Sequence, residues 1–170
     1  LKRGDLVACS GAGVANHAEA VAVPRLLVSR IPDGLDLKEA ASVTLGAIAM
    51  QGVRQANPRL GETVAVIGLG LLGQLTCQLL RAAGARVIGI DIDAGRIELA
   101  RKLGAEFVLA PSEAKKVQQI TEGFGADATI ITASTDSDEP LASAISVTRR
   151  KGTVVVVGAV GLGLKRQPWY

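Results

Sequence analysis

Aromatic side chains are scarce in this chain, because Phe, Tyr and Trp make up only 2% of its 170 residues. Charge of one sign is scarce too, since 19 Lys and Arg face 16 Asp and Glu, which leaves a formal net charge of +3. A nucleic-acid-binding surface needs clustered basic residues and aromatic rings on which bases stack, so we predict no nucleic-acid partner. At 48% hydrophobic and 21% charged residues, the composition also excludes a disordered chain.

Potential metal ligands are equally few. The sequence has one histidine, His17, and two cysteines, Cys9 and Cys77, which lie far apart. These cannot build a disulfide framework, a four-cysteine zinc site or a histidine-rich catalytic metal site. We therefore predict no metal ion in this chain and a reducing, cytoplasmic setting. Core packing is the expected role of Cys77, and a surface position is favoured for His17 over a role as general acid.

Long hydrophobic runs are also missing. The longest nearly apolar stretch, residues 153–164, contains three glycines and is too short to span a bilayer, so we predict no membrane association. The chain opens Leu-Lys-Arg-Gly-Asp, with no initiator Met and no signal peptide. We therefore expect a fragment of a longer protein.

Aliphatic runs separated by glycines are abundant. Runs with the character of strands buried on both faces begin near five positions: Thr63, Arg86, Glu106, Asp127 and Thr153. Between them, apolar residues recur at helical spacing, as in Leu72, Leu75 and Leu79. Gly84, Gly104 and Gly152 are expected to end three of these helices, with residues 149–151 as the cationic last turn of the final one. Alternating strands and helices predict an α/β fold with a doubly wound parallel sheet of about five strands.

The first 35 residues differ from this pattern. Short strands are expected at residues 6–9 and 18–23, in a β-rich segment too small to hold a core of its own. A helix should then run from about Leu37 to Ala56, with Asp36 as its N-cap and Asn57-Pro58 as its end. We expect a domain boundary here, between residues 1–35 and 36–170.

The segment from Thr63 to Asp91 carries the strongest functional pattern. An apolar strand runs into Gly68-Leu69-Gly70-Leu71-Leu72-Gly73, and a helix follows at once. Gly68 permits a tight turn, Gly70 lets a pyrophosphate approach the backbone, and Gly73 lets the helix lie close to the strand. The N–H groups and the dipole at the helix N-terminus then favour the phosphates. This unit predicts a dinucleotide-binding site of the Rossmann type.

Asp91 ends the second strand of this unit, where an acid accepts hydrogen bonds from an adenosine ribose. Its carboxylate would repel a 2′-phosphate and Ile92 follows it in place of an arginine, so we predict NAD, with NADP disfavoured. Arg96 leaves alternatives open: it could stack on adenine, reach a 2′-phosphate or be a solvated helix residue. Asp93 is expected to be the N-cap of that helix.

The order of these segments resembles the medium-chain dehydrogenase/reductase superfamily, the zinc-type alcohol dehydrogenase relatives. The matching segments begin with KRGDLVA, VPRLLVSRIPDGLDLKEAASVTLGAIAMQGVR and TVAVIGLGLLG, and end with VIGIDIDAGRIELARKLGAE and GTVVVVGAVG. The resemblance implies that residues 1–35 are the remnant of a GroES-like catalytic domain. It also implies that the rest is a Rossmann cofactor domain cut before its sixth strand. It allows a homodimer, because such proteins often pair through the edges of this sheet.

The same resemblance assigns further residues. The ends of the fourth and fifth strands would face the nicotinamide, which adds Ala133, Ser134, Val157, Gly158 and Ala159 to the cofactor set. Ser42 and Thr44 would lie near the same ring as weak candidates for a catalytic role. Thr44 and Leu45 stand where zinc-type members usually carry a cysteine ligand, so we expect a zinc-independent protein.

These observations predict part of an NAD-dependent oxidoreductase that moves hydride between nicotinamide and a small alcohol or carbonyl substrate, with a polyol or sugar as one option. We expect the chain alone to be inactive, since half of the substrate pocket would lie outside it. Two alternatives stay open: a nucleotide-sensing regulatory module, and a zinc-free quinone or enoyl reductase that uses NADPH.

Overall fold

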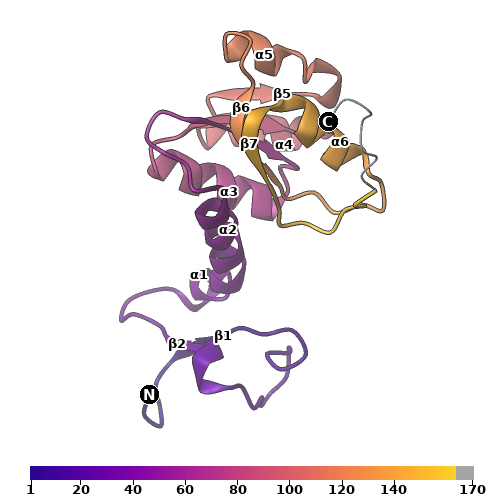
Figure 1. Cartoon of the computed structure of the whole chain (residues 1–170). Coiled ribbons are helices and arrows are strands. Elements are labelled where there is room, and N and C mark those ends of the chain that lie inside the picture. The colour runs from indigo at the N-terminus through magenta and orange to yellow at the C-terminus, as the bar shows by residue number, and fades with distance from the viewer. Residues whose placement is uncertain (164–170) are drawn as a thin grey trace. The chain divides into compact units, whose positions relative to one another are not determined.

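A computed structural model describes residues 1–163 of the chain (Figure 1). Its internal contacts divide the chain into two units, Leu1–Ala47 and the part from Ile48 onward. The expected boundary at residue 35 and the assignment of the first segment to a GroES-like domain stay predictions. No helix in the described part of the chain has the length and apolar character needed to cross a membrane.

The first unit contains a two-stranded antiparallel sheet. Strand β1 (Val7–Cys9) pairs with β2 (Val28–Arg30), and the 3-10 helix η1 (Arg25–Leu27) comes directly before β2. The first strand was expected, but the second prediction, at residues 18–23, is wrong. That stretch is irregular and lies on the surface, where Val21 is 43% exposed, because β1 pairs instead with the segment after Pro24. Ile31 and Ala40 are the buried hydrophobic residues of this unit, which fits the expectation of a very small core.

The helix expected from Leu37 to Ala56 is broken into α1 (Leu37–Ala40) and α2 (Val43–Ala56). Asp36 caps α1 as predicted, since its side chain accepts a hydrogen bond from the Lys38 amide at 2.7 Å. The break falls at Ser42, whose hydroxyl donates to the Glu39 carbonyl oxygen at 2.7 Å and competes with a regular helical bond there. Helix α2 ends at Ala56, directly before Asn57-Pro58, as expected.

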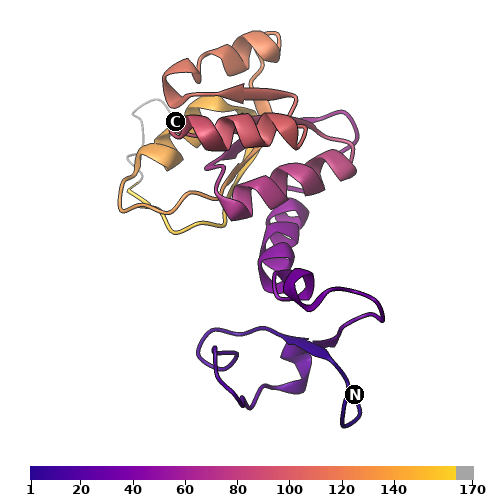
Figure 2. The same ribbon diagram turned by 180° about the vertical axis from the view of Figure 1, so that it is seen from behind.

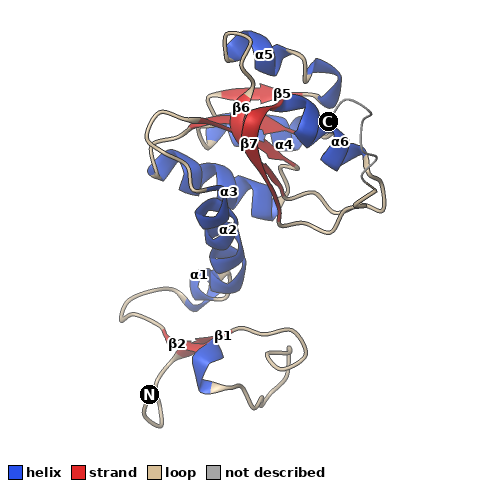
Figure 3. Ribbon diagram, in the orientation of Figure 1, coloured by secondary structure: helices blue, strands red, loops and turns tan. Residues whose placement is uncertain are grey.

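The second unit is built on a parallel sheet with strand order β5-β4-β3-β6-β7. The strands are β3 (Thr63–Ile67), β4 (Arg86–Ile90), β5 (Phe107–Leu109), β6 (Ala126–Ile131) and β7 (Thr148–Val156). The connecting helices are α3 (Leu71–Ala82), α4 (Ala94–Lys102), η2 (Pro111–Glu113), α5 (Lys116–Ile120) and α6 (Glu139–Val147). Figure 3 shows the strands in red between these helices, which confirms the doubly wound parallel fold.

Side chains alternate between the two faces of the sheet. Val64 and Val66 of β3 pack in the cluster that contains Leu80 of α3 and Ala100 of α4, the two helices seen together in Figure 2. Ile67 of β3 packs on the opposite face in a cluster with residues of α5 and α6. Both faces of each central strand are therefore buried, which accounts for the continuous aliphatic runs in the sequence.

Two of the three expected helix-ending glycines are confirmed. Gly84 and Gly104 have φ values of 82° and 97°, the left-handed conformation that closes α3 and α4. The third prediction is wrong, because α6 ends at Val147 and residues 149–151 lie in β7. Arg149 leaves the helical pattern because its Nε donates to Asp127 Oδ1 at 2.7 Å, and the positive φ, 60°, falls on Lys151. Gly152 is required for another reason, since a Cβ there would lie 2.8 Å from the Asp127 carbonyl oxygen.

Candidate functional site

A cavity of about 660 Å³ opens in the second unit, at the carboxyl ends of β3, β4 and β6. Strand β3 lies between β4 and β6. The connection from β3 to β4 contains α3 and packs on one face of the sheet, whereas the connection from β5 to β6 contains α5 and packs on the other, so the strand order reverses beside β3. Ligands of open α/β sheets bind at such a switch point. Seven of the predicted cofactor residues line the cavity: Gly68, Gly70, Asp91, Ile92, Arg96, Ala133 and Ser134.

The glycines of the loop after β3 have three different environments. Gly68 has a φ of 94°, and a Cβ there would lie 2.6 Å from the Ala133 amide nitrogen. A Cβ at Gly73 would lie only 1.9 Å from the Gly68 carbonyl oxygen, so α3 contacts the loop directly. Gly70 lines the cavity and a Cβ there would have no atom within 4 Å. The loop therefore needs Gly68 and Gly73 for its fold, whereas Gly70 leaves open space on the cavity side.

The N-terminus of α3 has no side-chain cap among residues 1–163. Gly70 is its N-cap and supplies no side chain to accept from the first N–H groups. The first four N–H groups of a helix have no partner within the helix, and the helix dipole adds partial positive charge at the same end. An anionic group in the cavity would accept hydrogen bonds from these N–H groups and would be attracted by the positive end of the helix dipole. The site therefore fits the pyrophosphate of a dinucleotide.

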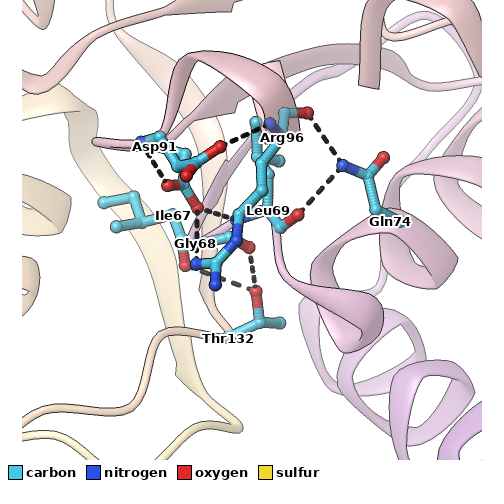
Figure 4. Close-up of polar contacts among 8 residues, drawn as sticks. Ile67, Gly68, Leu69, Gln74, Asp91, Arg96 and Thr132 are labelled. Atoms are coloured by element: carbon cyan, nitrogen blue, oxygen red, sulfur yellow. Dashed lines mark hydrogen bonds and ion pairs between the residues drawn. The ribbon is translucent and has the colours of Figure 1, made fainter. Parts of the chain in front are cut away.

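Thr132 fixes the loop from the side of β6. Its amide donates to the Ile67 carbonyl oxygen at 2.8 Å, and its hydroxyl donates to the Gly68 carbonyl oxygen at 2.5 Å (Figure 4). The Gly68 amide donates to the Ile90 carbonyl oxygen of β4 at 2.8 Å. The turn is therefore bonded to the strands on both sides of β3.

Asp91 lies at the end of β4 with its side chain buried, 6% exposed for the whole residue. One carboxylate oxygen, Oδ2, accepts from the Leu69 amide and lies 3.9 Å from Arg96 Nη1, while Oδ1 accepts from the Asp93 amide at 2.8 Å. A carboxylate has about four acceptor positions, so these two backbone bonds leave capacity for ribose hydroxyls. Asp93 caps α4 as expected, by accepting from the Arg96 amide at 2.9 Å.

The other predicted cofactor residues lie behind or beside the lining. Gly158 packs against the strand end, since a Cβ there would be 1.9 Å from the Ala133 carbonyl oxygen. The amides of Val157 and Gly158 donate to the Ile131 carbonyl oxygen, and the Ala159 carbonyl oxygen accepts from Thr135. Leu71, Leu72, Gly73 and residues 157–159 do not contribute to the lining, and their contact with a cofactor stays a prediction.

The two weak catalytic candidates, Ser42 and Thr44, belong to the first unit, Leu1–Ala47. Both hydroxyls have local partners, because Ser42 donates to Glu39 and Thr44 donates to the Cys9 carbonyl oxygen at 3.5 Å. Their proposed place near the nicotinamide stays a prediction.

The sequence pattern missed several residues of the site. The cavity is also lined by Pro111, Thr135, Ser137, Glu139, Pro140 and Ser143. Glu139, Pro140 and Ser143 lie at the start of α6, and the helix that follows the carboxyl end of β6 borders the switch point. Gln74, which is buried behind the loop, was also missed. No motif covers it, but its place one residue after the last loop glycine puts it on the first turn of α3.

Metal-ligand clusters and reactive thiols can be examined in the part of the chain that the structure describes. Within residues 1–163, no group of three or more His, Cys, Asp or Glu side chains is placed to hold a metal ion. Cys77 lies in the core behind the loop, and burial raises the pKa of its thiol to about 12, so it is protonated at neutral pH.

Comparisons with known proteins agree with this geometry. The zinc-binding dehydrogenase family matches residues 72–168, more than half of the chain, so the chain belongs to that family. D-guloside 3-dehydrogenase of Escherichia coli K12 is 41% identical over 115 residues, 65% of this chain and 33% of that protein. An alcohol dehydrogenase of Geobacillus stearothermophilus is 35% identical over 133 residues, 77% of this chain and 39% of that protein.

A solved structure agrees as well. A zinc-binding dehydrogenase from Sinorhizobium meliloti 1021 bound to NADP superposes with a TM-score of 0.76 at 32% identity, over 86% of this chain and 45% of that one. This chain therefore spans 33–45% of the length of these relatives. The resemblance to medium-chain dehydrogenases and the Rossmann fold are both confirmed.

Proposed function

We propose that this chain forms the cofactor-binding part of a dehydrogenase that prefers NAD and acts on an alcohol or polyol. The observation that carries the proposal is the pairing, in one cavity, of an uncapped helix N-terminus at Gly70 with the buried carboxylate of Asp91. The first suits a pyrophosphate and the second suits ribose hydroxyls. The names of the relatives, an alcohol dehydrogenase and a guloside dehydrogenase, support the substrate class.

When bound, the nicotinamide ring accepts or donates hydride. The chain's own part is to bind and orient. The N–H groups at the start of α3 hold the pyrophosphate, and Asp91 accepts from the adenosine ribose. Ala133 and Ser134, at the end of β6, border the cavity and limit where the ring can lie. Ser42 and Thr44 are proposed as polar groups near that ring.

The preference for NAD follows from charge. The Asp91 carboxylate would repel a 2′-phosphate, and it is buried, where water screens charge weakly. Arg96 lies 3.9 Å from that carboxylate and partly offsets it. The Sinorhizobium relative is bound to NADP, so selectivity in this family has to be measured for each chain.

Calorimetric titration with NAD⁺ and with NADP⁺ tests the proposal. We expect NAD⁺ to bind more tightly than NADP⁺. Asp91→Asn removes the charge but keeps an acceptor oxygen, so it should weaken NAD⁺ binding by about tenfold and lower the preference for NAD⁺ over NADP⁺. Glu98→Gln is the matched control, since that acid lies on α4, is exposed and pairs with Arg101. Absence of dinucleotide binding, or equal effects of the two variants, would refute the proposal.

The proposal extends to the substrate, location, metal content and oligomeric state of the whole protein. We propose a small-molecule substrate, a cytoplasmic location, independence from zinc and a homodimer, with neither nucleic acid nor membrane as a partner. Size-exclusion chromatography with light scattering tests the dimer, and metal analysis of the purified protein tests the absence of zinc.

A further inference from the structure

Four residues form a closed ring of polar contacts beside the cavity (Figure 4). The Asp91 carboxylate accepts from the Leu69 amide, and the Leu69 carbonyl oxygen accepts from Gln74 Nε2 at 2.9 Å. The same Nε2 donates to the Arg96 carbonyl oxygen at 2.9 Å, and Arg96 Nη1 lies 3.9 Å from Asp91 Oδ2. The ring joins the loop after β3, the first turn of α3, the end of β4 and the first turn of α4.

The chemistry of the ring fixes the orientation of the Gln74 amide. Its two partners are carbonyl oxygens, which accept hydrogen bonds only, so the NH₂ group must face them. Gln74 is 5% exposed, and its Oε1 has no hydrogen-bond partner among the described residues. A buried acceptor without a partner is unfavourable, so packing alone does not account for glutamine at this position.

The Arg96 backbone is held by Gln74 of the ring and by Asp93. Asp93 holds the Arg96 amide, and Gln74 holds its carbonyl oxygen against the loop. The Arg96 side chain is 56% exposed and extends toward Asp91, where Nη1 lies 3.9 Å from Oδ2. The Arg96 guanidinium is less available to a 2′-phosphate when it lies beside the Asp91 carboxylate. That carboxylate can still accept a hydrogen bond from a ribose hydroxyl.

We propose that Gln74 is a selectivity-positioning residue, which favours a dinucleotide with a free 2′-hydroxyl over one with a 2′-phosphate by tying Arg96 to the phosphate-binding loop. The inference rests on the proposed function, since it concerns the same cavity. Gln74 does not line that cavity and acts through Arg96 and Leu69.

Gln74→Met tests the proposal, because methionine keeps the length and helix propensity of the side chain but cannot donate to the two carbonyls. Gln78→Met is the matched control: it makes the same change one turn further along α3, where the side chain is exposed and donates to the Gln74 carbonyl oxygen at 3.2 Å, which is not one of the ring contacts. The dissociation constants for NAD⁺ and NADP⁺ are measured by calorimetry for the chain and for both variants, and thermal melts report folding.

In Gln74→Met we expect the dissociation constant for NAD⁺ to rise about tenfold and that for NADP⁺ to rise less, so that the NAD⁺ preference falls several-fold. Gln78→Met should leave the ratio of the two constants unchanged. An equal rise in both constants would show a merely structural role and overturn the inference. If Gln74→Met does not fold, Gln74→Asn keeps the amide on a shorter chain and should move the ratio in the same direction.

A double variant tests whether Gln74 acts through Arg96. Arg96→Met alone should change the ratio, and Gln74→Met added to it should change the ratio no further. Additive changes would overturn the inference while the proposed function stands. Failure of the unmodified chain to bind either dinucleotide would instead refute the proposed function, so the two failures are distinguishable.

Discussion

The same substitution at two glycines of one loop separates folding from binding. In Gly73→Ala, the added Cβ would lie 1.9 Å from the Gly68 carbonyl oxygen and 2.9 Å from the Thr132 hydroxyl oxygen. In Gly70→Ala, the added Cβ would have no atom within 4 Å and would project from the cavity lining. The first variant should therefore lose stability, and the second should lose affinity alone.

The magnitude for Gly73→Ala follows from the contact. Ordinary van der Waals contact of a Cβ begins at 3.4 Å, so helix and loop would have to separate by 3.4 − 1.9 = 1.5 Å. Overpacking of this kind costs about 1–3 kcal/mol, and loss of the Thr132 bond to Gly68 adds about 1 kcal/mol. The higher helix propensity of alanine offsets about 1 kcal/mol of this loss in stability. We expect a net loss of about 2 kcal/mol in the free energy of unfolding.

Gly70→Ala has no such contact. Gly70 has a φ of −66°, which alanine adopts without strain, so the free energy of unfolding should not fall and can rise by up to about 1 kcal/mol. Its methyl group would occupy the space where a pyrophosphate approaches the backbone, and NAD⁺ affinity should fall by about 100-fold. Urea unfolding followed by circular dichroism measures the first quantity, and calorimetry the second. Wild-type affinity in Gly70→Ala, or wild-type stability in Gly73→Ala, would refute the geometry of the loop.

Thr132, Leu80 and Cys77 each allow a further measurement. Thr132→Val should weaken NAD⁺ binding about threefold to tenfold in a calorimetric titration, because it removes the hydroxyl that holds the Gly68 carbonyl. Leu80→Ala should lower the free energy of unfolding by about 2–5 kcal/mol in urea, because Leu80 is fully buried between α3 and the sheet. Burial raises the pKa of Cys77 from 9.0 to about 12, so the unfolded state loses this proton first and stability should fall between those pH values, by about 1.4 kcal/mol per pH unit.

Each of these three predictions has a control variant or a reference protein. Thr129→Val is the control for Thr132→Val, since Thr129 lies on β6, the strand that Thr132 directly follows, with its hydroxyl bonded to Thr148, and is absent from the cavity lining. Equal binding losses would contradict the assignment. Leu99→Ala, on the exposed side of α4, should have a small effect beside Leu80→Ala. The stability gap between the wild-type chain and Cys77→Ala should narrow above pH 9, and parallel profiles would show that the thiol is accessible.

The sheet and the loop could be predicted from the sequence because each depends on local pattern. Val64 to Ile67 is a continuous aliphatic run, and Gly68, Gly70 and Gly73 have the spacing that the turn requires. In the structure the three glycines have distinct environments: a positive φ at Gly68, open space at Gly70 and a close contact with the loop at Gly73.

The wrong predictions depend on partners distant in the sequence. Residues 149–151 have the charge pattern of a helix end, but Arg149 pairs with Asp127 and the segment joins the sheet beside β6. Residues 18–23 have an extended pattern, but β1 pairs with residues after Pro24. Gln74 belongs to no local motif, because its partners come from the loop before α3 and from α4.

The bonding of Gly68 to β4 and of its neighbour Ile67 to β6 has a kinetic consequence. The turn continues the hydrogen-bond ladders of the sheet on both sides, so its N–H groups are held in place before any ligand arrives. Little backbone motion remains to be frozen when a phosphate docks, and less of the interaction energy is lost to ordering. The association rate of the dinucleotide's phosphates with this loop is then governed by diffusion and charge. The residence time of the dinucleotide depends on how firmly its other parts are bound.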